Sequence, residues 1–226
     1  LEHKGSGSLI TNHHVVSSAT SVSTSEFGKF VYPIAGHQIQ LYMGTSRYDS
    51  TKEPGSLAVK GVSRVLTFPQ SQSGIPRIFD IALIVLKQKV PLSSVITPVC
   101  LKFLNIHDHI GKTAYAAGFG YDQTAKFTEY RKHVPMAIEK FDLCRWYYTK
   151  EISDGRASKY YCAGGSNGET AFDFDDPLYM KIDGKWYLIG IMSWLESYYS
   201  SYNKDKPFLY EDISSFVNWI VNQVKR

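Results

Sequence analysis

This sequence of 226 residues is short of charge and has no long apolar run. Charged residues make up 20% of it, below the usual quarter, and its lysines and arginines stand singly, which argues against a nucleic-acid-binding surface. No apolar run approaches ~18 residues, so we expect no membrane-spanning helix and no membrane partner. No signal peptide opens the chain as given, and we therefore expect a soluble or a processed protein.

Cysteine is also scarce, and this limits both disulfides and metal sites. Two close pairs of histidines occur, but neither has a cysteine or glutamate at ligand spacing, so we predict no metal ion and no cofactor. One disulfide between the last two cysteines is compatible with their spacing, although composition alone does not establish an oxidising compartment. An odd number of cysteines cannot all pair within the chain: Cys100, Cys144 and Cys162.

Aromatic residues, by contrast, are abundant at 14%, with 16 tyrosines, so we expect tyrosines on the surface. Residues 196–203 read Glu-Ser-Tyr-Tyr-Ser-Ser-Tyr-Asn, a mixture typical of adaptable binding loops. Tyr198, Tyr199 and Tyr202 are therefore a candidate binding loop, and a solvated loop with incidental tyrosines is the alternative. The aromatic residues of 145–148 are a second candidate, or else pack the core.

Short, closely spaced β-prone segments fill most of the chain, which is typical of an all-β protein. The end differs, because the apolar positions between 213 and 224 recur at intervals of three and one, the stripe of a helix packed on a core. The polar segment 102–112 is the best candidate for a domain boundary. The clearest predicted strands are 31–34, 39–44, 57–62 and 80–86.

Several motifs resemble those of the trypsin- and chymotrypsin-like serine proteases, in the same order. Residues 80–86 resemble the Asp-Ile-Ala-Leu strand of that family, and residues 162–164 match its Cys-Ala-Gly. Residues 168–178 resemble the nucleophile loop, Gly-Asp-Ser-Gly-Gly-Pro-Leu, and residues 190–194 resemble Gly-Ile-Val-Ser-Trp. Residues 206–221 resemble the Lys-Pro-Gly-Val-Tyr strand and the terminal helix.

This resemblance covers nearly the whole chain and implies a fold. It implies two six-stranded antiparallel β-barrels and a C-terminal α-helix, with residues 1–106 in the first barrel and residues 107–226 in the second. The family's first strand and its Ile-Val-Gly-Gly start have no match here. The resemblance further implies a disulfide between Cys144 and Cys162, with Cys100 unpaired in this chain.

The catalytic positions of the family are degenerate on this alignment. Thr20 stands in place of the general-base histidine and Phe174 in place of the nucleophilic serine, whereas the triad aspartate is kept as Asp80. Without a histidine to orient, Asp80 is expected to accept hydrogen bonds from backbone amides or from the Thr20 hydroxyl. Because acyl transfer needs a nucleophile and a base, we predict a protein that is not an enzyme.

The neighbouring loops are altered as well. In the oxyanion loop, Phe172 replaces a glycine whose backbone conformation is costly for a bulky residue, while Asp173 is kept. The specificity pocket has Gly168 at its floor, and Leu195 and Phe208 replace wall glycines, so we predict a blocked pocket and no small-molecule substrate.

The two glycines after the nucleophile are replaced by Asp175 and Asp176. Together with Asp173 they could form a new acid/base or metal site, but a charged surface loop is the interpretation that we favour.

Loss of catalytic and pocket residues from a retained fold is the pattern of a pseudoenzyme. It is similar to that of the scabies mite inactivated protease paralogues, relatives of the mite group 3 allergens. This resemblance implies a secreted, extracellular protein of the mite gut and faeces that binds host complement proteins and inhibits complement activation. The sequence itself does not show complement binding.

Two other hypotheses remain open. One is that the protein is a decoy that binds protease inhibitors or substrates without cleavage. The side chains of Leu195 and Phe208 disfavour this hypothesis, because they should block the insertion of an anchoring side chain into the pocket. The other is a protease that uses different residues.

Overall fold

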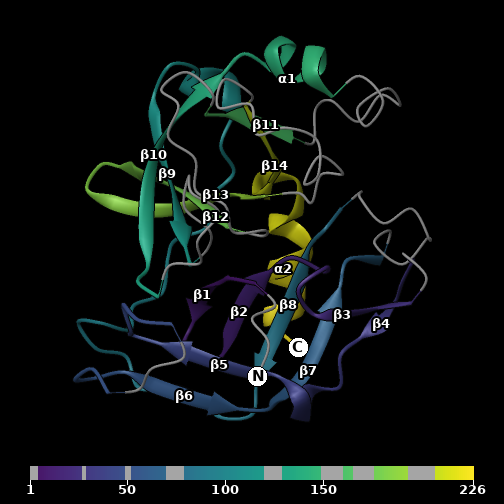
Figure 1. Ribbon diagram of the computed structural model, residues 1–226, viewed down its shortest axis with the longest axis vertical. Coiled ribbons are helices and arrows are strands. Elements are labelled where there is room, and N and C mark those ends of the chain that lie inside the picture. The colour runs from purple at the N-terminus through teal and green to yellow at the C-terminus, as the bar shows by residue number, and fades with distance from the viewer. Residues whose placement is uncertain are drawn as a thin grey trace.

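The computed structural model describes eight stretches of the chain, and strands dominate them (Figure 1). Strands β1 to β8 lie in the lower half of the view and β9 to β14 in the upper half, with helix α2 in the middle (Figure 1). Among the described residues, no helix is long and apolar enough to cross a membrane. The described stretches are 5–26, 29–48, 52–69, 79–119, 129–148, 160–164, 176–192 and 207–226.

The upper half is a closed antiparallel barrel, in the order β10-β11-β14-β13-β12-β9, which confirms the predicted second barrel. Side-chain alternation explains its wall: on β10, Val134, Met136 and Ile138 point inward and the residues between them outward. Its strands are β9 (Thr113–Gly118), β10 (Lys132–Glu139), β11 (Tyr160–Ala163), β12 (Pro177–Ile182), β13 (Lys185–Met192) and β14 (Phe208–Asp212).

The closed six-stranded barrel that we predicted for the lower half does not appear among its described residues. These residues form one four-stranded sheet, β1-β2-β8-β7, and two separate hairpins, β3-β4 and β5-β6. The sheet and the β5-β6 hairpin contact each other through a shared apolar core that includes Val15, Ile84 and Leu41. A closed barrel would instead join them by a continuous ladder of backbone hydrogen bonds. The strands are β1 (Gly7–Thr11), β2 (His14–Ser17), β3 (Ser23–Glu26), β4 (Lys29–Pro33), β5 (Gln40–Met43), β6 (Leu57–Lys60), β7 (Val62–Thr67) and β8 (Ala82–Leu86).

The chain passes from the lower half to the upper half between Leu86, the end of β8, and Thr113, the start of β9. The boundary that we predicted at residues 106 and 107 falls in this interval and stays a prediction. Part of the interval runs along β13, because Cys100 donates its backbone N–H to Trp186 and accepts one from Leu188. Cys100 forms no disulfide.

A short helix that the sequence did not predict, α1 (Phe141–Tyr147), follows β10. Seven residues are too few to display a helical repeat, so its apolar pattern gave no signal. A disulfide joins Cys144 on α1 to Cys162 on β11, as predicted. Both cysteines pack with Leu209 of β14 in a small buried cluster, which ties the helix to the barrel wall.

The predicted terminal helix is present as α2 (Val217–Val224), preceded by a 3-10 turn, η6 (Ile213–Phe216). The side chain of Asp212 caps this turn by accepting the backbone N–H of Ser214 at 2.8 Å. The helix is central to the molecule because its apolar face contacts both halves. This shared cluster takes Val16, Ile81 and Leu83 from the lower half, Leu188 and Ile191 from β13, and Ile213, Phe216, Val217 and Ile220 from the C-terminal segment.

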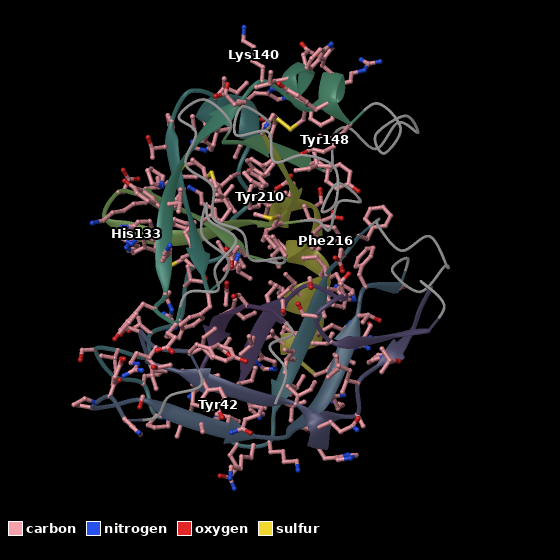
Figure 2. All side chains as sticks on the ribbon, viewed as in Figure 1. Tyr42, His133, Lys140, Tyr148, Tyr210 and Phe216 are labelled. Carbon is pink, nitrogen blue, oxygen red and sulfur yellow. A yellow bond between two sulfur atoms is a disulfide. The ribbon has the colours of Figure 1, made fainter. Side chains whose placement is uncertain are left out.

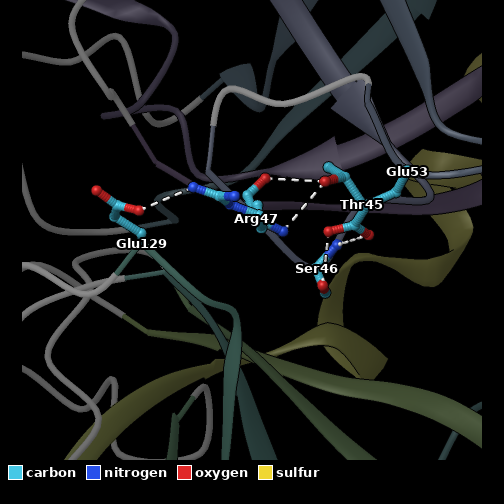
Figure 3. A network of polar contacts seen from close by, with 5 residues as sticks. All are labelled: Thr45, Ser46, Arg47, Glu53 and Glu129. Atoms are coloured by element: carbon cyan, nitrogen blue, oxygen red, sulfur yellow. Dashed lines mark hydrogen bonds and ion pairs between the residues drawn. The ribbon is translucent and has the colours of Figure 1, made fainter.

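A second junction between the halves lies after β5 (Figure 3). The backbone N–H of Tyr48 donates to Glu129, and that of Arg131 donates to Ser46, at 2.6 and 2.7 Å. Arg47 also forms an ion pair with Glu129 at 3.1 Å (Figure 3). Both of these side chains are largely exposed, so the ion pair adds little stability and the backbone pairing carries the junction.

Local hydrogen bonds hold this segment in the shape that the junction needs (Figure 3). The carboxylate of Glu53 accepts both the backbone N–H and the hydroxyl of Ser46, each at 2.7 Å. Thr45 donates its hydroxyl to the carbonyl of Arg47 and accepts the backbone N–H of the same residue. Hydrogen bonds within residues 45–53 therefore hold this segment in place beside residues 129–131, which precede β10.

Gly118, the last residue of β9, makes room for a buried acid. A Cβ atom at this position would collide with the carboxylate of Asp176, which is only 1% exposed. We expect Gly118→Ala to lower the free energy of unfolding by about 1–3 kcal/mol through overpacking.

In an Asp176→Ala background, Gly118→Ala should lower the free energy of unfolding by less, because alanine lacks the colliding oxygens. Urea unfolding of the wild type, both single variants and the double variant gives this coupling. Equal costs of Gly118→Ala in the two backgrounds would contradict the contact.

Candidate functional site

Thr20 and Asp80 meet where the resemblance places the catalytic base and its aspartate. Thr20 lies in the turn after β2, and Asp80 lies two residues before β8. The backbone N–H of Thr20 donates to Oδ1 of Asp80 and the Thr20 hydroxyl donates to Oδ2, both at 2.8 Å. This is the arrangement expected from the sequence. The threonine hydroxyl donates a hydrogen bond to the carboxylate, so it is a donor where catalysis would need a proton acceptor.

A hydrogen-bonded turn fixes the position of Thr20. The hydroxyls of Ser18 and Ser21 share a buried hydrogen bond of 2.7 Å, and Ser18 Oγ also accepts the N–H of Ser21. The carbonyl of Thr20 accepts the N–H of Ser23. Ser21 occupies the position at which the resembled family has a half-cystine, so hydrogen bonds between serines brace the turn here.

The backbone before Asp80 is bent into an unusual conformation. Phe79 has a φ of 58°, in the left-handed region that bulky side chains rarely adopt. Its ring packs on Phe68 and Phe216, at 5.4 and 6.0 Å between centroids. These contacts offset the strain and turn the next N–H, that of Asp80, toward the second barrel.

That N–H donates to Oε1 of Glu211 on β14, at 3.1 Å. Glu211 is completely buried, and no sequence motif pointed to it. Burial, followed by the charge of Asp80, raises the pKa of Glu211 to about 8. Burial also raises the pKa of Asp80 to about 6, although its hydrogen bonds from Thr20 act in the opposite direction. Two acids thus share one interior site, and the protein favours their protonated forms.

Phe208 is the one residue of the predicted specificity pocket that the structure places. It begins β14, is partly buried, and packs against the core of the second barrel. Its ring lies 3.4 Å from the point where a Cβ of Gly164 would stand, beside Met136. The ring therefore packs against the core of the second barrel, and the blocked pocket stays a prediction.

Asp176 corrects one of our expectations. We favoured a charged surface loop, but Asp176 is buried at the start of the barrel wall, where its carbonyl accepts the N–H of Met192 at 3.0 Å. Burial raises the pKa of Tyr210, and it raises the pKa of Tyr179 to about 12. The charge of Asp176 acts in the same direction on both hydroxyls. The space beside Gly118 admits this carboxylate.

The other predicted site residues lie outside the described part of the chain. Within that part, no group of three or more His, Cys, Asp or Glu side chains could hold a metal ion. The structure thus brings Thr20 and Asp80 together and adds Glu211 to them. The predictions that remain are those on Gly168, Phe172, Asp173, Phe174, Leu195, Tyr198, Tyr199 and Tyr202.

The buried acids predict a stability that falls as the pH rises. Because the pKa of Glu211 is higher in the folded than in the unfolded chain, its contribution is complete below the unfolded value and is lost as the pH rises through about 8. Urea unfolding at a series of pH values should show this decline.

In Glu211→Gln, which keeps an acceptor for the Asp80 N–H, the part of the decline that extends from the unfolded pKa up to about pH 8 should disappear. Glu139→Gln, at a partly exposed position on β10, is the matched control and should behave as the wild type. If the free energy of unfolding of Glu211→Gln declined with pH as steeply as that of the wild type, the Glu211 carboxyl would not be the origin of the decline.

Comparison with known proteins agrees with the motifs and the barrel. The family model described as Trypsin matches residues 2–220. CLIP domain-containing serine protease B4 of Anopheles gambiae is 29% identical over 64% of this chain and 41% of its own length. Haptoglobin of Bos taurus is 24% identical over 97% of this chain and 58% of its own length. Complement C1r subcomponent-like protein of Mus musculus is 23% identical over 96% of this chain and 44% of its own length.

The chain spans about half the length of these relatives. The match to the family model nevertheless takes in both halves of the fold, the Thr20–Asp80 pair and the first half of helix α2. The chain therefore belongs to the trypsin family of serine proteases and their homologues.

Proposed function

We propose that this chain is a proteolytically inactive trypsin homologue that acts as a secreted binding protein and interferes with host complement activation. The observation that carries the first part is the pair of hydrogen bonds from Thr20 to Asp80. In a working triad the aspartate orients a histidine that takes the nucleophile's proton. Here the aspartate accepts hydrogen bonds from the residue in the histidine's position, and that residue cannot take up a proton.

The loss of the base is independent of the nucleophile. The Thr20 side chain has no basic nitrogen, and its hydroxyl proton is engaged by the carboxylate. The alignment puts Phe174 at the nucleophile position, and a phenyl ring has no group that attacks a carbonyl. Neither half of the proton-transfer step is left.

A binding role is supported by what the chain keeps. The disulfide between Cys144 and Cys162 favours an oxidising, extracellular environment. Trp146 on α1 is 72% exposed with Tyr147 against it, and exposed aromatic residues of this kind are frequent anchors of protein interfaces. The complement partner rests on the resemblance to the mite paralogues, and one relative is named for its likeness to complement C1r.

The purified chain is expected to release no product from fluorogenic peptides above the buffer rate, and Asp80→Ala should leave that result unchanged. Active trypsin at the same molar concentration is the positive control. Hydrolysis that survives Asp80→Ala and is lost on changing another carboxylate would instead establish a protease that uses other residues.

Complement-mediated lysis of sensitised red cells in human serum tests the binding function. We expect dose-dependent protection by the purified chain, because a complement component would be occupied. The control is an unrelated trypsin-fold protein without activity. Variants with Tyr198, Tyr199 and Tyr202 changed to serine, and separately Trp146→Ala, show which surface is used.

Absence of protection at concentrations well above those of the complement components would contradict the complement part of the proposal. Binding of protease inhibitors by the same sample, without protection of the cells, would favour the decoy hypothesis.

A further inference from the structure

The outer face of the second barrel bears a row of aromatic and cationic side chains. The imidazole of His133 on β10 lies 6.2 Å from the Tyr115 ring on β9, which lies 5.6 Å from the Trp186 ring on β13, measured between centroids. Nζ of Lys181 on β12 stands 5.9 Å from the centroid of Trp186. We call these four residues the outer row. Figure 2 shows its first member, His133, at the outer side of the barrel, whereas Tyr210 lies within it.

Strand geometry places these side chains on one face. Lys181 and Trp186 are cross-strand partners in the β12-β13 hairpin, and the residues that flank Tyr115 point into the barrel core. Trp186 keeps 44% of its surface exposed although its ring contacts Tyr115 and Lys181. A large exposed ring that neighbours already hold loses little conformational freedom when a ligand covers it.

The outer row itself carries one full positive charge. Lys181 is exposed and shares a face with Trp186, its cross-strand partner. Lys132 and Lys185 are also exposed, but alternation turns them to the other face of their strands, the one that Val134 and Ile182 present to the barrel core. In the described part of the chain, Lys181 forms no ion pair with a carboxylate. Asp183, in the turn of the hairpin, is the nearest acidic residue in sequence. The Lys181 ammonium is therefore available to an anionic ligand.

The closed barrel disfavours a peptide as this ligand. Extended peptides commonly bind by adding a strand to an exposed sheet edge. Here β9 pairs with β10 on one side and with β12 on the other, and β12 also pairs with β13, so β9 and β12 are not free edges of the sheet. Recognition has to come from side chains alone.

The ring orientations disfavour single-stranded nucleic acid. Bases stack on flat aromatic platforms. The Tyr115 and Trp186 rings instead meet at 80°, edge to face, and the imidazole of His133 is tilted by 49° from Tyr115. The outer row thus alternates ring faces, ring edges and cations along a sheet surface, without a parallel stack.

We propose that the outer row binds an anionic polysaccharide, a chain of sulfated or carboxylated sugars. Sugar rings have apolar faces that suit Trp186 and Tyr115, whose rings are themselves apolar with polar tips. Sulfate or carboxylate groups along the chain pair with the ammonium of Lys181. This site is separate from the Thr20–Asp80 pair and does not depend on the complement hypothesis.

The test is titration of the purified chain with a size-defined heparin fragment at low ionic strength, followed by calorimetry. We expect binding that weakens steeply with added salt. Lys181→Glu and Trp186→Ala should each weaken it by roughly tenfold or more, and Trp186→Phe should retain most of it.

Matched controls separate the outer row from general charge and hydrophobicity. Lys60→Glu reverses an exposed charge at the end of β6, and Trp146→Ala removes an exposed tryptophan from α1; both should bind as the wild type. Near-UV circular dichroism verifies that each variant is folded. The desulfated form of the same fragment should bind at least roughly tenfold more weakly, since its anionic groups are reduced.

Three results would overturn the proposal. They are an absence of binding at low salt, equal losses in Lys181→Glu and Lys60→Glu, and binding of poly-glutamate or of an oligonucleotide through the same residues as tightly as of the heparin fragment. The serum lysis assay on the outer-row variants keeps the two proposals apart, because loss of glycan binding is expected to leave protection of red cells unchanged.

Discussion

The apolar contact beneath helix α2 is the constraint on which the rest of this molecule depends. Ile81 and Leu83 of the lower half, Leu188 and Ile191 of β13 and the buried face of the C-terminal segment form one cluster. Asp80 directly precedes Ile81, and Glu211 lies two residues before that segment, so the same packing brings the two acids together. The polar site is thus located by hydrophobic burial, and the junction at Arg47 and Glu129 secures the halves at a second place.

The site shows what a buried carboxylate requires of the fold around it. A buried carboxylate needs hydrogen-bond donors whether or not it takes part in catalysis, because an unpaired one is costly. Thr20 supplies two donors to Asp80 from one residue, and the strained backbone at Phe79 aims the N–H of Asp80 at Glu211. Every hydrogen bond of this group that we describe ends within the fold, and none requires a substrate.

The parts that the sequence predicted are those with an extended pattern. Strand alternation and family motifs predicted the second barrel, a helical stripe predicted α2, and the motif around Asp80 predicted its bonds to Thr20. Glu211 gave no signal because Leu209, Tyr210 and Glu211 are all buried, which abolishes alternation in β14. Asp176 misled us because charge alone predicts exposure, whereas its burial depends on the absence of a side chain at Gly118. The hairpins of the lower half depend on backbone pairing that composition does not specify.

The space beside Gly118 also limits which pairs of residues these two positions can hold. The buried carboxylate of Asp176 fits the barrel wall because position 118 has no Cβ atom. A side chain at position 118 therefore calls for a smaller residue at position 176. We expect the two positions to be epistatic, so that the residue tolerated at one is conditional on the residue present at the other.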